Sequence, residues 1–268
     1  MLNGLRSKKN IVLQGPPGVG KTFVAKKLAA SLLGTYDPQR MELIQFHPSF
    51  SYEDFVQGMR PDKDGKFRLK DGIFFRLCSK AKRDPQRDYC LIIDEINRAH
   101  LGKVFGELMM LLEADKRDPS YAVRLTYADE EQEKFFIPEN VYLIGTMNTA
   151  DKSLSLMDLA LRRRFAFYDL LPGFALPKFE SFLREAGMEH ALIRHLIREM
   201  AKLNDEIEKD RKNLGPGFEI GHSYFCPKVG ETPDRQWYER IIKHEIRGIL
   251  LEYFGEDMAE YERSLLAG

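Results

Sequence analysis

The sequence predicts an α/β fold, in which a parallel sheet with helices on both faces is followed by a smaller helical domain. Short apolar segments of strand length alternate with segments of helical periodicity over the first two thirds of the chain. The first of these strands runs into a glycine-rich turn that opens a helix. Beyond residue 172 the periodicity is mostly helical. We therefore expect an α/β domain over residues 1–172 and a helical domain over residues 173–268.

The composition sets limits on the class of protein. The chain has 268 residues, of which 43% are hydrophobic, enough for a substantial core. Its net charge is zero, which argues against a whole surface that coats nucleic acid but leaves room for a local basic lining, as in a ring pore. Three cysteines without a C-x-x-C spacing suggest neither a disulfide framework nor a zinc site, and a cytoplasmic setting fits them best. The longest apolar runs are too short to span a membrane, and no signal peptide is visible.

The elements are predicted in chain order from periodicity and turn residues. The expected strands are residues 10–14, 41–46, 89–94, 141–146 and 165–170. The expected helices are residues 23–34, a turn that starts at Ser51 with Asp54 in a capping box, 101–114, 179–187, 193–210 and 237–255. Two hairpins are expected, over residues 60–72 and 123–137. Parallel strands deliver their carboxyl ends to one edge of a sheet, and that edge is where such folds bind ligands.

The segment "GPPGVGKT" matches the phosphate-binding pattern G-x-x-x-x-G-K-[ST] in full. Its backbone N–H groups and the following helix N-terminus favour phosphate, Lys21 is expected to reach the β- and γ-phosphates, and Thr22 is expected to hold Mg²⁺. A glycine-rich turn with a chance lysine is the alternative, and the flanking strand and helix argue against it. The expected nucleotide-binding residues are Gly15, Pro16, Pro17, Gly18, Val19, Gly20, Lys21 and Thr22.

Two carboxylates end the third strand in "LIIDEINR". Asp94 is expected to hold Mg²⁺ or its water, and Glu95 is expected to act as the general base that activates water. The alternative is a solvated acidic turn. Because the phosphate-binding motif is complete, the pair favours hydrolysis over simple nucleotide binding.

Polar residues also follow the fourth strand, in "IGTMNTADKS". Asn148 is expected to orient the attacking water, and Asp151 is expected to accept hydrogen bonds from a basic group that a partner protein supplies. The alternative is a turn whose side chains satisfy local backbone groups.

Two further segments leave alternatives open. In "DLALRRRF", an arginine either offsets the helix C-terminal dipole or projects into a neighbouring subunit's nucleotide. In "GFEIGHSYF", His222 and Ser223 either face the nucleotide from the helical domain or form an ordinary turn. The "MMLL" run and Phe46, Phe74 and Phe75 are interpreted as core.

With these motifs in hand, the chain resembles the AAA+ module of the McrB family, the GTP-dependent motor of a modified-cytosine restriction system. The segments that carry the resemblance are "GPPGVGKTFVA", "QFHPSFSYEDFVQGMRP", "KDGIF", "IIDEINRA", "KVFGELMMLLE", "LTY", "PENVYLIGTMNTADKSL", "ALRRRF" and "GHSYF". The resemblance implies an AAA+ fold with a helical lid, hexameric rings with nucleotide between protomers, a preference for GTP, and a nuclease partner of the McrC kind. It also implies DNA recognition through an N-terminal domain that this sequence lacks, or through the assembled complex.

The resemblance assigns particular residues. The signature turn corresponds to Asn148, Thr149, Ala150 and Asp151, and the residues that act between subunits correspond to Asp158, Arg163 and Arg164. Lys152 stands where many members have arginine, so it keeps the charge without a bidentate fork.

The leading hypothesis is therefore a Mg²⁺-dependent GTPase motor, with cleavage supplied by another subunit because no nuclease constellation is evident. An ATP-dependent AAA+ remodelling protein of the MoxR kind, with a similar helix insert, is the alternative. The N-K-x-D guanine signature of small GTPases is missing, so the sequence does not reveal which residues contact guanine. A non-hydrolysing scaffold is a third possibility, against which Glu95 argues.

Overall fold

The computed structural model describes residues 1–129, 133–151, 159–210 and 212–267. The chain divides into two compact units, which are described separately. The first unit comprises Met1–Gln14 and Lys21–Asp169, and the second comprises Gly15–Gly20 and Leu170–Gly268. The glycine-rich turn of the phosphate-binding motif therefore belongs, by its contacts, with the C-terminal residues.

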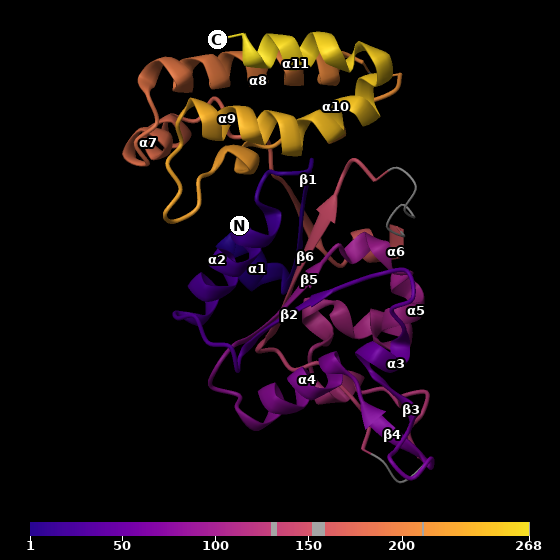
Figure 1. Ribbon diagram of the computed structural model, residues 1–268. Coiled ribbons are helices and arrows are strands. Elements are labelled where there is room, and N and C mark those ends of the chain that lie inside the picture. The colour runs from indigo at the N-terminus through magenta and orange to yellow at the C-terminus, as the bar shows by residue number, and fades with distance from the viewer. Residues whose placement is uncertain (130–132, 152–158, 211, 268) are drawn as a thin grey trace. The chain divides into compact units, whose positions relative to one another are not determined.

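A five-stranded sheet forms the centre of the first unit (Figure 1). Its spatial order is β2-β5-β6-β1-β7, and the pairs β2–β5, β5–β6 and β1–β7 are parallel. Its strands are β1 (Asn10–Gly15), β2 (Met41–Gln45), β5 (Tyr89–Asp94), β6 (Val141–Asn148) and β7 (Ala166–Asp169). The predicted parallel sheet is confirmed. The register pairs Ile93 with Gly145, so the residues that follow β5 and β6 emerge at the same edge.

Helices lie on both sides of this sheet. Figure 1 shows α1 and α2 on one side and α3 and α5 on the other. The helices of the unit are α1 (Leu2–Lys8), α2 (Lys21–Leu33), α3 (Tyr52–Phe55), α4 (Ile73–Arg83), α5 (Leu101–Phe105) and α6 (Leu159–Arg162). The predicted capping box begins α3: Asp54 accepts from the Ser51 N–H at 3.1 Å. Because helices cover both faces, the central strands β1, β5 and β6 are buried along most of their length, whereas the edge strands β2 and β7 are partly exposed.

The segment predicted as one helix over residues 101–114 is broken. The α-helix ends at Phe105, and residues Gly106–Leu112 form a 3₁₀ helix instead. Gly106 has a φ of 50°, and a Cβ there would lie 3.1 Å from the ring of Tyr52. The backbone reverses its φ at this glycine, which interrupts the α-helical hydrogen bonds.

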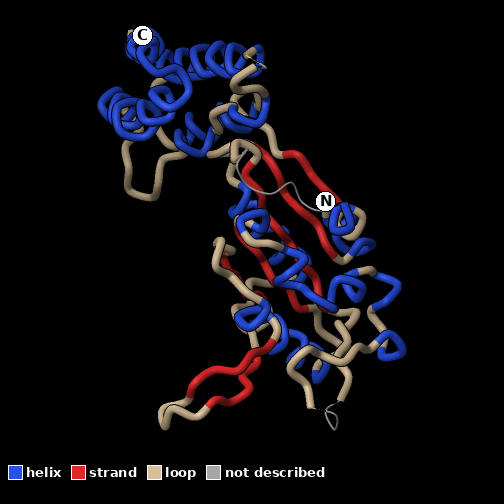
Figure 2. Tube along the Cα trace, turned by 90° about the vertical axis from the view of Figure 1, so that its right-hand side faces the viewer, coloured by secondary structure: helices blue, strands red, loops and turns tan. Residues whose placement is uncertain are grey.

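The first predicted hairpin is present and the second is reduced. β3 (Gln57–Pro61) pairs antiparallel with β4 (Phe67–Asp71), and this hairpin projects away from the five-stranded sheet (Figure 2). In place of a ladder over 123–137, the described residues form a single bridge between Val123 and Phe135. Residues 130–132 of that segment lie outside the described chain.

The core of the first unit lies between the sheet and α3, α4 and α5. Its aromatic centre is formed by Phe46, Phe55, Phe74 and Phe105, all fully buried. Phe55 stacks on Phe74 with ring centroids 4.8 Å apart, and Phe105 meets the Phe55 ring edge-on. The interpretation of Phe46 and Phe74 as core residues is therefore confirmed.

The second unit has its own core, within a bundle of helices. Its helices are α7 (Pro177–Glu185), α8 (His190–Lys209), α9 (Arg235–Ile241), a π-helical turn (Ile242–Ile246), α10 (Arg247–Phe254) and α11 (Met258–Leu266). α8 and α11 lie side by side (Figure 1), and α8 buries a stripe that includes Leu196, Met200 and Leu203. None of the helices in the described parts of the chain combines the length and apolar character needed to cross a membrane.

Candidate active site

At the carboxyl end of β5, the Asp94 carboxylate meets two hydroxyl groups, one from α2 and one from β6. Thr22, in the first turn of α2, donates its hydroxyl to Asp94 Oδ1 at 2.9 Å. The buried Thr146 hydroxyl donates to the same oxygen. The two residues predicted as Mg²⁺ ligands therefore lie within one hydrogen bond of each other. Hydroxyl and carboxylate oxygens are hard ligands of the kind Mg²⁺ takes, so the residues fit the ion.

Glu95 lies next to this pair in a strained conformation. Its φ of 52° and ψ of 48° place a non-glycine residue in the left-handed region, which costs on the order of 1 kcal/mol. Its N–H donates to the Thr146 hydroxyl at 3.2 Å, so Thr146 holds both carboxylate residues. The buried Oε2 atom has no hydrogen-bond partner among the described residues. Burial raises the pKa of Glu95, Arg98 opposes the shift, and Asp151 and Asp94 add to it. A carboxylate with an unused lone pair and a raised pKa is suited to take a proton.

The charges around Lys21 are predominantly negative. Burial lowers the pKa of Lys21, and the carboxylates of Glu95, Asp94 and Asp151 oppose this. Three carboxylates thus lie close to one lysine. Such an excess of negative charge favours a divalent cation at this edge of the sheet.

Arg98 links the two predicted functional turns and was missed from the sequence. It lies at the end of the short 3₁₀ helix Ile96–Arg98, with Nε 3.6 Å from Glu95 Oε2 and Nη2 3.2 Å from Asp151 Oδ2. The Asp151 carboxylate was expected to accept hydrogen bonds from a partner's basic group, and in this structure it accepts one from within the chain. The sequence could have suggested this contact, because Arg98 follows Glu95 by three residues and one helical turn brings side chains at that spacing together. Asn148 Oδ1 accepts a long bond of 3.4 Å from the Ala150 N–H.

The adjacent arginines of "RRRF" lie in different environments. The side chain of Arg164 is 8% exposed and its Nη2 is 2.9 Å from Glu113 Oε1. The side chain of Arg163 is 67% exposed, with a longer contact of 3.3 Å to the same oxygen. Arg162 lies over the ring of Phe167. Asp158, the third residue that the family resemblance assigned here, lies outside the described residues.

A buried polar network anchors the segment that contains these arginines. Arg117 is fully buried and donates to Val141 O at 2.9 Å and to Asn10 Oδ1 at 2.6 Å. Burial lowers the pKa of Arg117 to about 10. Asn10 Nδ2 donates in turn to Leu112 O at 2.7 Å and to Arg164 O at 3.0 Å. Sequence reasoning gave neither Asn10 nor Arg117 a role. The sequence offered one hint: Asn10 stands at the start of an apolar strand, and a polar side chain that is buried there needs a hydrogen-bond partner.

In the second unit, the glycine-rich turn packs against the segment that contains "GHSYF". The Gly221 N–H donates to Pro17 O at 2.9 Å, and the Ser223 N–H donates to Gly18 O at 2.8 Å. Gly18 has a φ of 75°, and a Cβ there would lie 2.3 Å from the Tyr224 ring. Glycine is therefore required at position 18 both for its backbone angle and for this close approach.

His222 is held by a backbone group and by aromatic rings. Its Nδ1 accepts from the Gly173 N–H at 2.9 Å, which leaves the neutral ring with its proton on Nε2. The ring meets those of Phe174 and Phe179 edge-on, and burial lowers the pKa of His222. The Ser223 main chain thus contacts the glycine-rich turn directly, whereas the His222 side chain contacts Gly173. That they face a nucleotide stays a prediction.

A complete phosphate-binding motif, followed at the sheet edge by a threonine–aspartate pair and a strained glutamate, defines a class: the chain is a P-loop NTPase. More particularly, the chain belongs to the AAA domain family, in its dynein-related subfamily, whose model matches residues 10–165. Residues 195–262 match the alpha-helical lid domain of McrB. The predicted AAA+ fold with a helical lid and the resemblance to the McrB family are thereby confirmed.

Two curated relatives align over nearly the whole chain. The "Type IV methyl-directed restriction enzyme EcoKMcrB subunit" of Escherichia coli K12 is 54% identical over 259 residues, which cover 96% of this chain. The chain spans 56% of that relative's length. The "Type II restriction enzyme BsuMI component YdiS" of Bacillus subtilis is 25% identical, covering 96% of this chain and 81% of the relative. Among solved structures, PCH-2 of C. elegans is similar with a TM-score of 0.39 and 15% identity, over 99% of this chain and 65% of that one.

Proposed function

We propose that the chain is the GTP-hydrolysing motor of a modification-dependent restriction complex. One observation carries the catalytic part: the partly buried, strained Glu95, whose Oε2 atom accepts no hydrogen bond from the described residues, lies beside the Thr22–Asp94 pair. The names of the relatives, a methyl-directed restriction subunit and a restriction enzyme component, support the biological part. The preference for GTP and the use of a separate nuclease subunit rest on the family resemblance.

In the proposed reaction, residues Gly15 to Gly20 bind the phosphates through main-chain N–H groups and Lys21 neutralises their charge. Thr22 and Asp94 hold Mg²⁺, which offsets charge on the phosphate oxygens. Glu95 accepts the proton of the attacking water, and Asn148 orients that water. His222 and Ser223 approach the nucleotide from the lid. The raised pKa makes the Glu95 carboxylate a stronger base, which favours transfer of the proton from the attacking water.

In the proposed assembly, protomers form a ring and an arginine of one protomer reaches the nucleotide of the next. Arg163 is the better candidate, because its side chain is largely exposed whereas that of Arg164 is buried against Glu113. An arginine in that position stabilises charge on the transferring phosphoryl group. Asp158 is assigned to the same interface by the resemblance.

The decisive measurement is phosphate release from GTP and from ATP by the purified chain, with Mg²⁺ and across a range of protein concentrations. We expect GTP to be hydrolysed faster, with a specific activity that rises with protein concentration. Lys21→Ala is the control and should abolish turnover. Faster hydrolysis of ATP would favour a remodelling ATPase of the MoxR kind instead.

Mixing two inactive variants tests the trans arginine separately. Arg163→Ala keeps an intact Lys21, and Lys21→Ala keeps an intact Arg163, so mixed rings contain sites with both groups. We expect the mixture to recover part of the wild-type turnover. If the mixture stays as inactive as its components, Arg163 does not act between subunits.

A further inference from the structure

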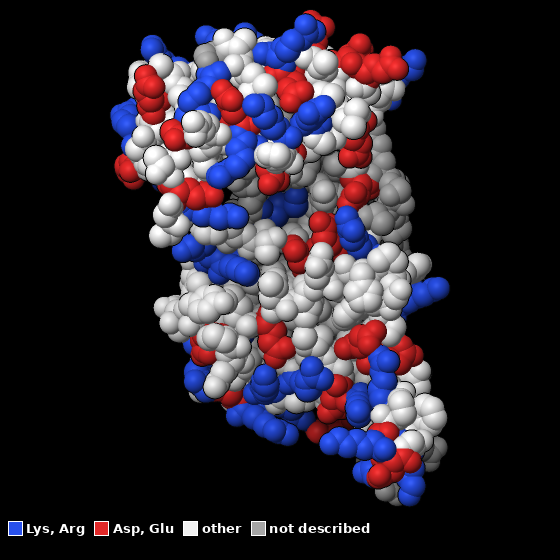
Figure 3. Space-filling view, viewed as in Figure 1, with Lys and Arg blue, Asp and Glu red and all other residues white. Residues whose placement is uncertain are grey.

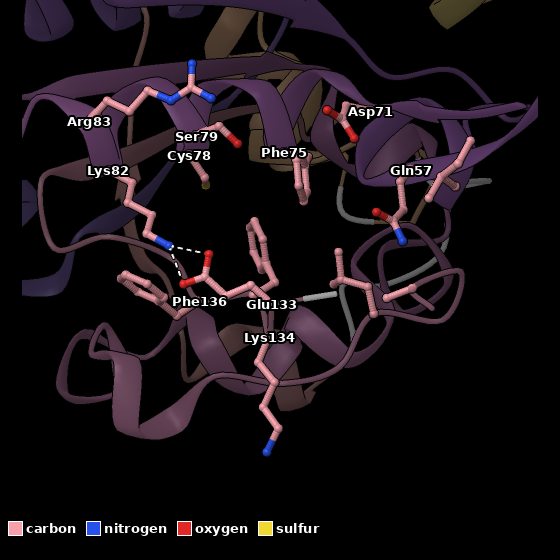
Figure 4. Close-up of a pocket in the computed structure, with 14 residues that line it drawn as sticks. Gln57, Asp71, Phe75, Cys78, Ser79, Lys82, Arg83, Glu133, Lys134 and Phe136 are labelled. Carbon is pink, nitrogen blue, oxygen red and sulfur yellow. Dashed lines mark hydrogen bonds and ion pairs between the residues drawn. The ribbon is translucent and has the colours of Figure 1, made fainter. Parts of the chain in front are cut away.

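A cavity lies in the first unit, among the β3–β4 hairpin, α4 and residues 125–128 and 133–136. Its volume is about 500 Å³, within the range of pockets that take specific ligands. The floor is apolar: Phe75 stacks on Phe135 with ring centroids 5.3 Å apart, and Leu125 and Ala128 complete it. Figure 4 shows Phe75 pointing into the cavity and the Lys82–Glu133 ion pair closing one side of it.

A buried polar side chain without a partner faces this cavity. Gln57, the first residue of β3, is 2% exposed, and its Nε2 has no hydrogen-bond partner among the described residues. Figure 4 shows its amide on the cavity side. A buried amide donor that is left unpaired destabilises the fold, because it loses its hydrogen bond to water without gaining another. A ligand that offers an acceptor atom at this point removes that cost.

An exposed apolar ridge continues from the cavity along the hairpin. Strand alternation and the antiparallel register place Gln57, Met59 and Pro61 opposite Asp71, Leu69 and Phe67 on one face. Gln57, Leu69 and Asp71 line the cavity, whereas Met59 and Phe67 are 46% and 67% exposed. The ridge therefore runs about 13 Å from the cavity towards the hairpin tip, the length of four strand residues. Alternate apolar side chains at this spacing match an extended polypeptide.

The charges around the cavity favour an acidic occupant. The hairpin Gln57–Asp71 contains five basic and three acidic residues, α4 contains four basic and no acidic residues, and the segment 125–136 contains one basic and four acidic residues, so the three segments together carry a net charge of +3. Figure 3 shows basic side chains gathered along α4. Asp71 and Glu133 at the cavity itself disfavour a nucleic acid, because every nucleotide carries a phosphate. A polypeptide can direct its acidic side chains away from these two carboxylates.

We propose that the cavity and the hairpin ridge together bind an acidic, extended segment of a partner protein, which inserts apolar side chains into the cavity and offers a main-chain carbonyl to Gln57. The recognition is independent of the nucleotide chemistry: affinity comes from the apolar floor and ridge, orientation from the Gln57 amide, and selection for acidic sequences from α4 and the hairpin.

Binding is tested by fluorescence anisotropy with a labelled hexapeptide Glu-Asp-Phe-Leu-Asp-Glu and a matched peptide in which alanine replaces phenylalanine and leucine. Saturable binding of the first peptide below about 1 mM and at least ten-fold weaker binding of the second are expected, since two buried apolar side chains are lost. A single-stranded oligothymidylate is the third probe. Absence of saturable peptide binding, equal binding of both peptides, or saturable binding of the oligonucleotide alone overturns the proposal.

Two tryptophan variants locate the site. Ser79 lines the cavity, and Ser79→Trp fills it, whereas Gln86→Trp adds the same ring at an exposed, uncharged position just beyond α4. The first should abolish peptide binding and the second should leave it within two-fold, with nucleotide turnover unchanged in both. Gln57→Leu keeps the volume but removes the donor, and should weaken binding about five-fold, as the loss of one hydrogen bond predicts. If Ser79→Trp is not folded by thermal melting, Gln57→Leu decides: unchanged affinity in that variant overturns the assignment.

Discussion

Glu95 at the edge of the sheet and Glu199 in the helical unit are both largely shielded from water, yet their surroundings act in opposite directions. Burial raises the pKa of Glu95, whose Oε2 lacks a hydrogen-bond partner in the described structure. Burial alone would also raise the pKa of Glu199, but hydrogen bonds from Arg198, Lys202 and Ser264 lower it to about 2. The Ser264 bond, at 3.0 Å, joins α8 to α11.

The difference separates a carboxylate arranged for chemistry from one arranged for stability. Glu199 has its charge matched by donors, so its ionisation favours the folded state. Glu95 combines burial, a left-handed backbone and an unsatisfied oxygen, each of which costs free energy that the surrounding fold offsets. Ionisable side chains that are held in such unfavourable surroundings are expected at sites where a reaction uses them.

The largest expected effect is that of Glu95→Gln on turnover. The amide fills the same space but does not accept the proton of water, so GTP hydrolysis should fall about 10³-fold, with nucleotide affinity retained.

The same Glu95→Gln variant should have a higher free energy of unfolding than wild type. Since the folded-state pKa of Glu95 is raised, the charged form is disfavoured on folding, and the uncharged amide should stabilise the protein at neutral pH. This gain should disappear below the ordinary pKa of glutamate, because wild type is then protonated as well. Urea unfolding at two pH values, together with turnover, measures both effects. Near-normal hydrolysis by the variant removes Glu95 from the role of base.

Glu199→Ala should show the reverse pattern. Loss of the charged acceptor should lower the free energy of unfolding of the helical unit by about 2 kcal/mol, leaving nucleotide turnover of the folded protein unchanged. The folded-state pKa is about 2 against an ordinary value of 4.5, so this stability is present above pH 4.5 and is lost as the pH falls towards 2. The difference between wild type and variant in urea unfolding should therefore shrink over that interval. A difference that is constant from neutral pH down to pH 2 contradicts the ionic origin.

Arg164→Met and Arg163→Met extend the comparison to two neighbouring residues. Arg164 is buried against Glu113, so its replacement should destabilise the chain by about 1 kcal/mol. Arg163 is largely exposed, and its replacement should leave the urea midpoint unchanged while lowering turnover at concentrations where rings form. Each variant is the control for the other. Equal destabilisation by both would mean that exposure does not separate their roles.

The smallest expected effect is a shift in pH dependence caused by Arg98→Met. Arg98 opposes the raised pKa of Glu95 more strongly than Lys21 does, so its removal should raise that pKa further. Because the base works only when deprotonated, the acid limb of the turnover–pH profile should move to higher pH, with little change on the plateau. Lys103→Met, at an exposed position on α5, provides the control. A profile that does not move would show that the Arg98 charge does not act on the base.

The central strands could be predicted from the sequence because a buried parallel strand is apolar over nearly its whole length, as residues 89–93 are. The broken helix at Gly106 could not be predicted, because the close approach of the Tyr52 ring, which leaves little room for a Cβ at position 106, joins residues far apart in the sequence. The second hairpin was overestimated for a related reason: alternation over residues 123–137 fits a strand pair, yet a single bridge is formed in the described part.

The sequence by itself determined the motifs whose residues are neighbours along the chain: the phosphate-binding turn, the Asp94–Glu95 pair and the polar turn after β6. Their chemistry follows from residue type and spacing, both of which are local properties. Only the tertiary structure decided which side chains meet. Arg98 lies between Glu95 and Asp151, Thr146 holds Asp94 and the Glu95 backbone, and Asn10 bonds to the carbonyl of Arg164. Apart from the Arg98–Glu95 contact, these contacts join residues 51 to 154 positions apart. Such pairings are set by strand order and packing, which periodicity does not encode.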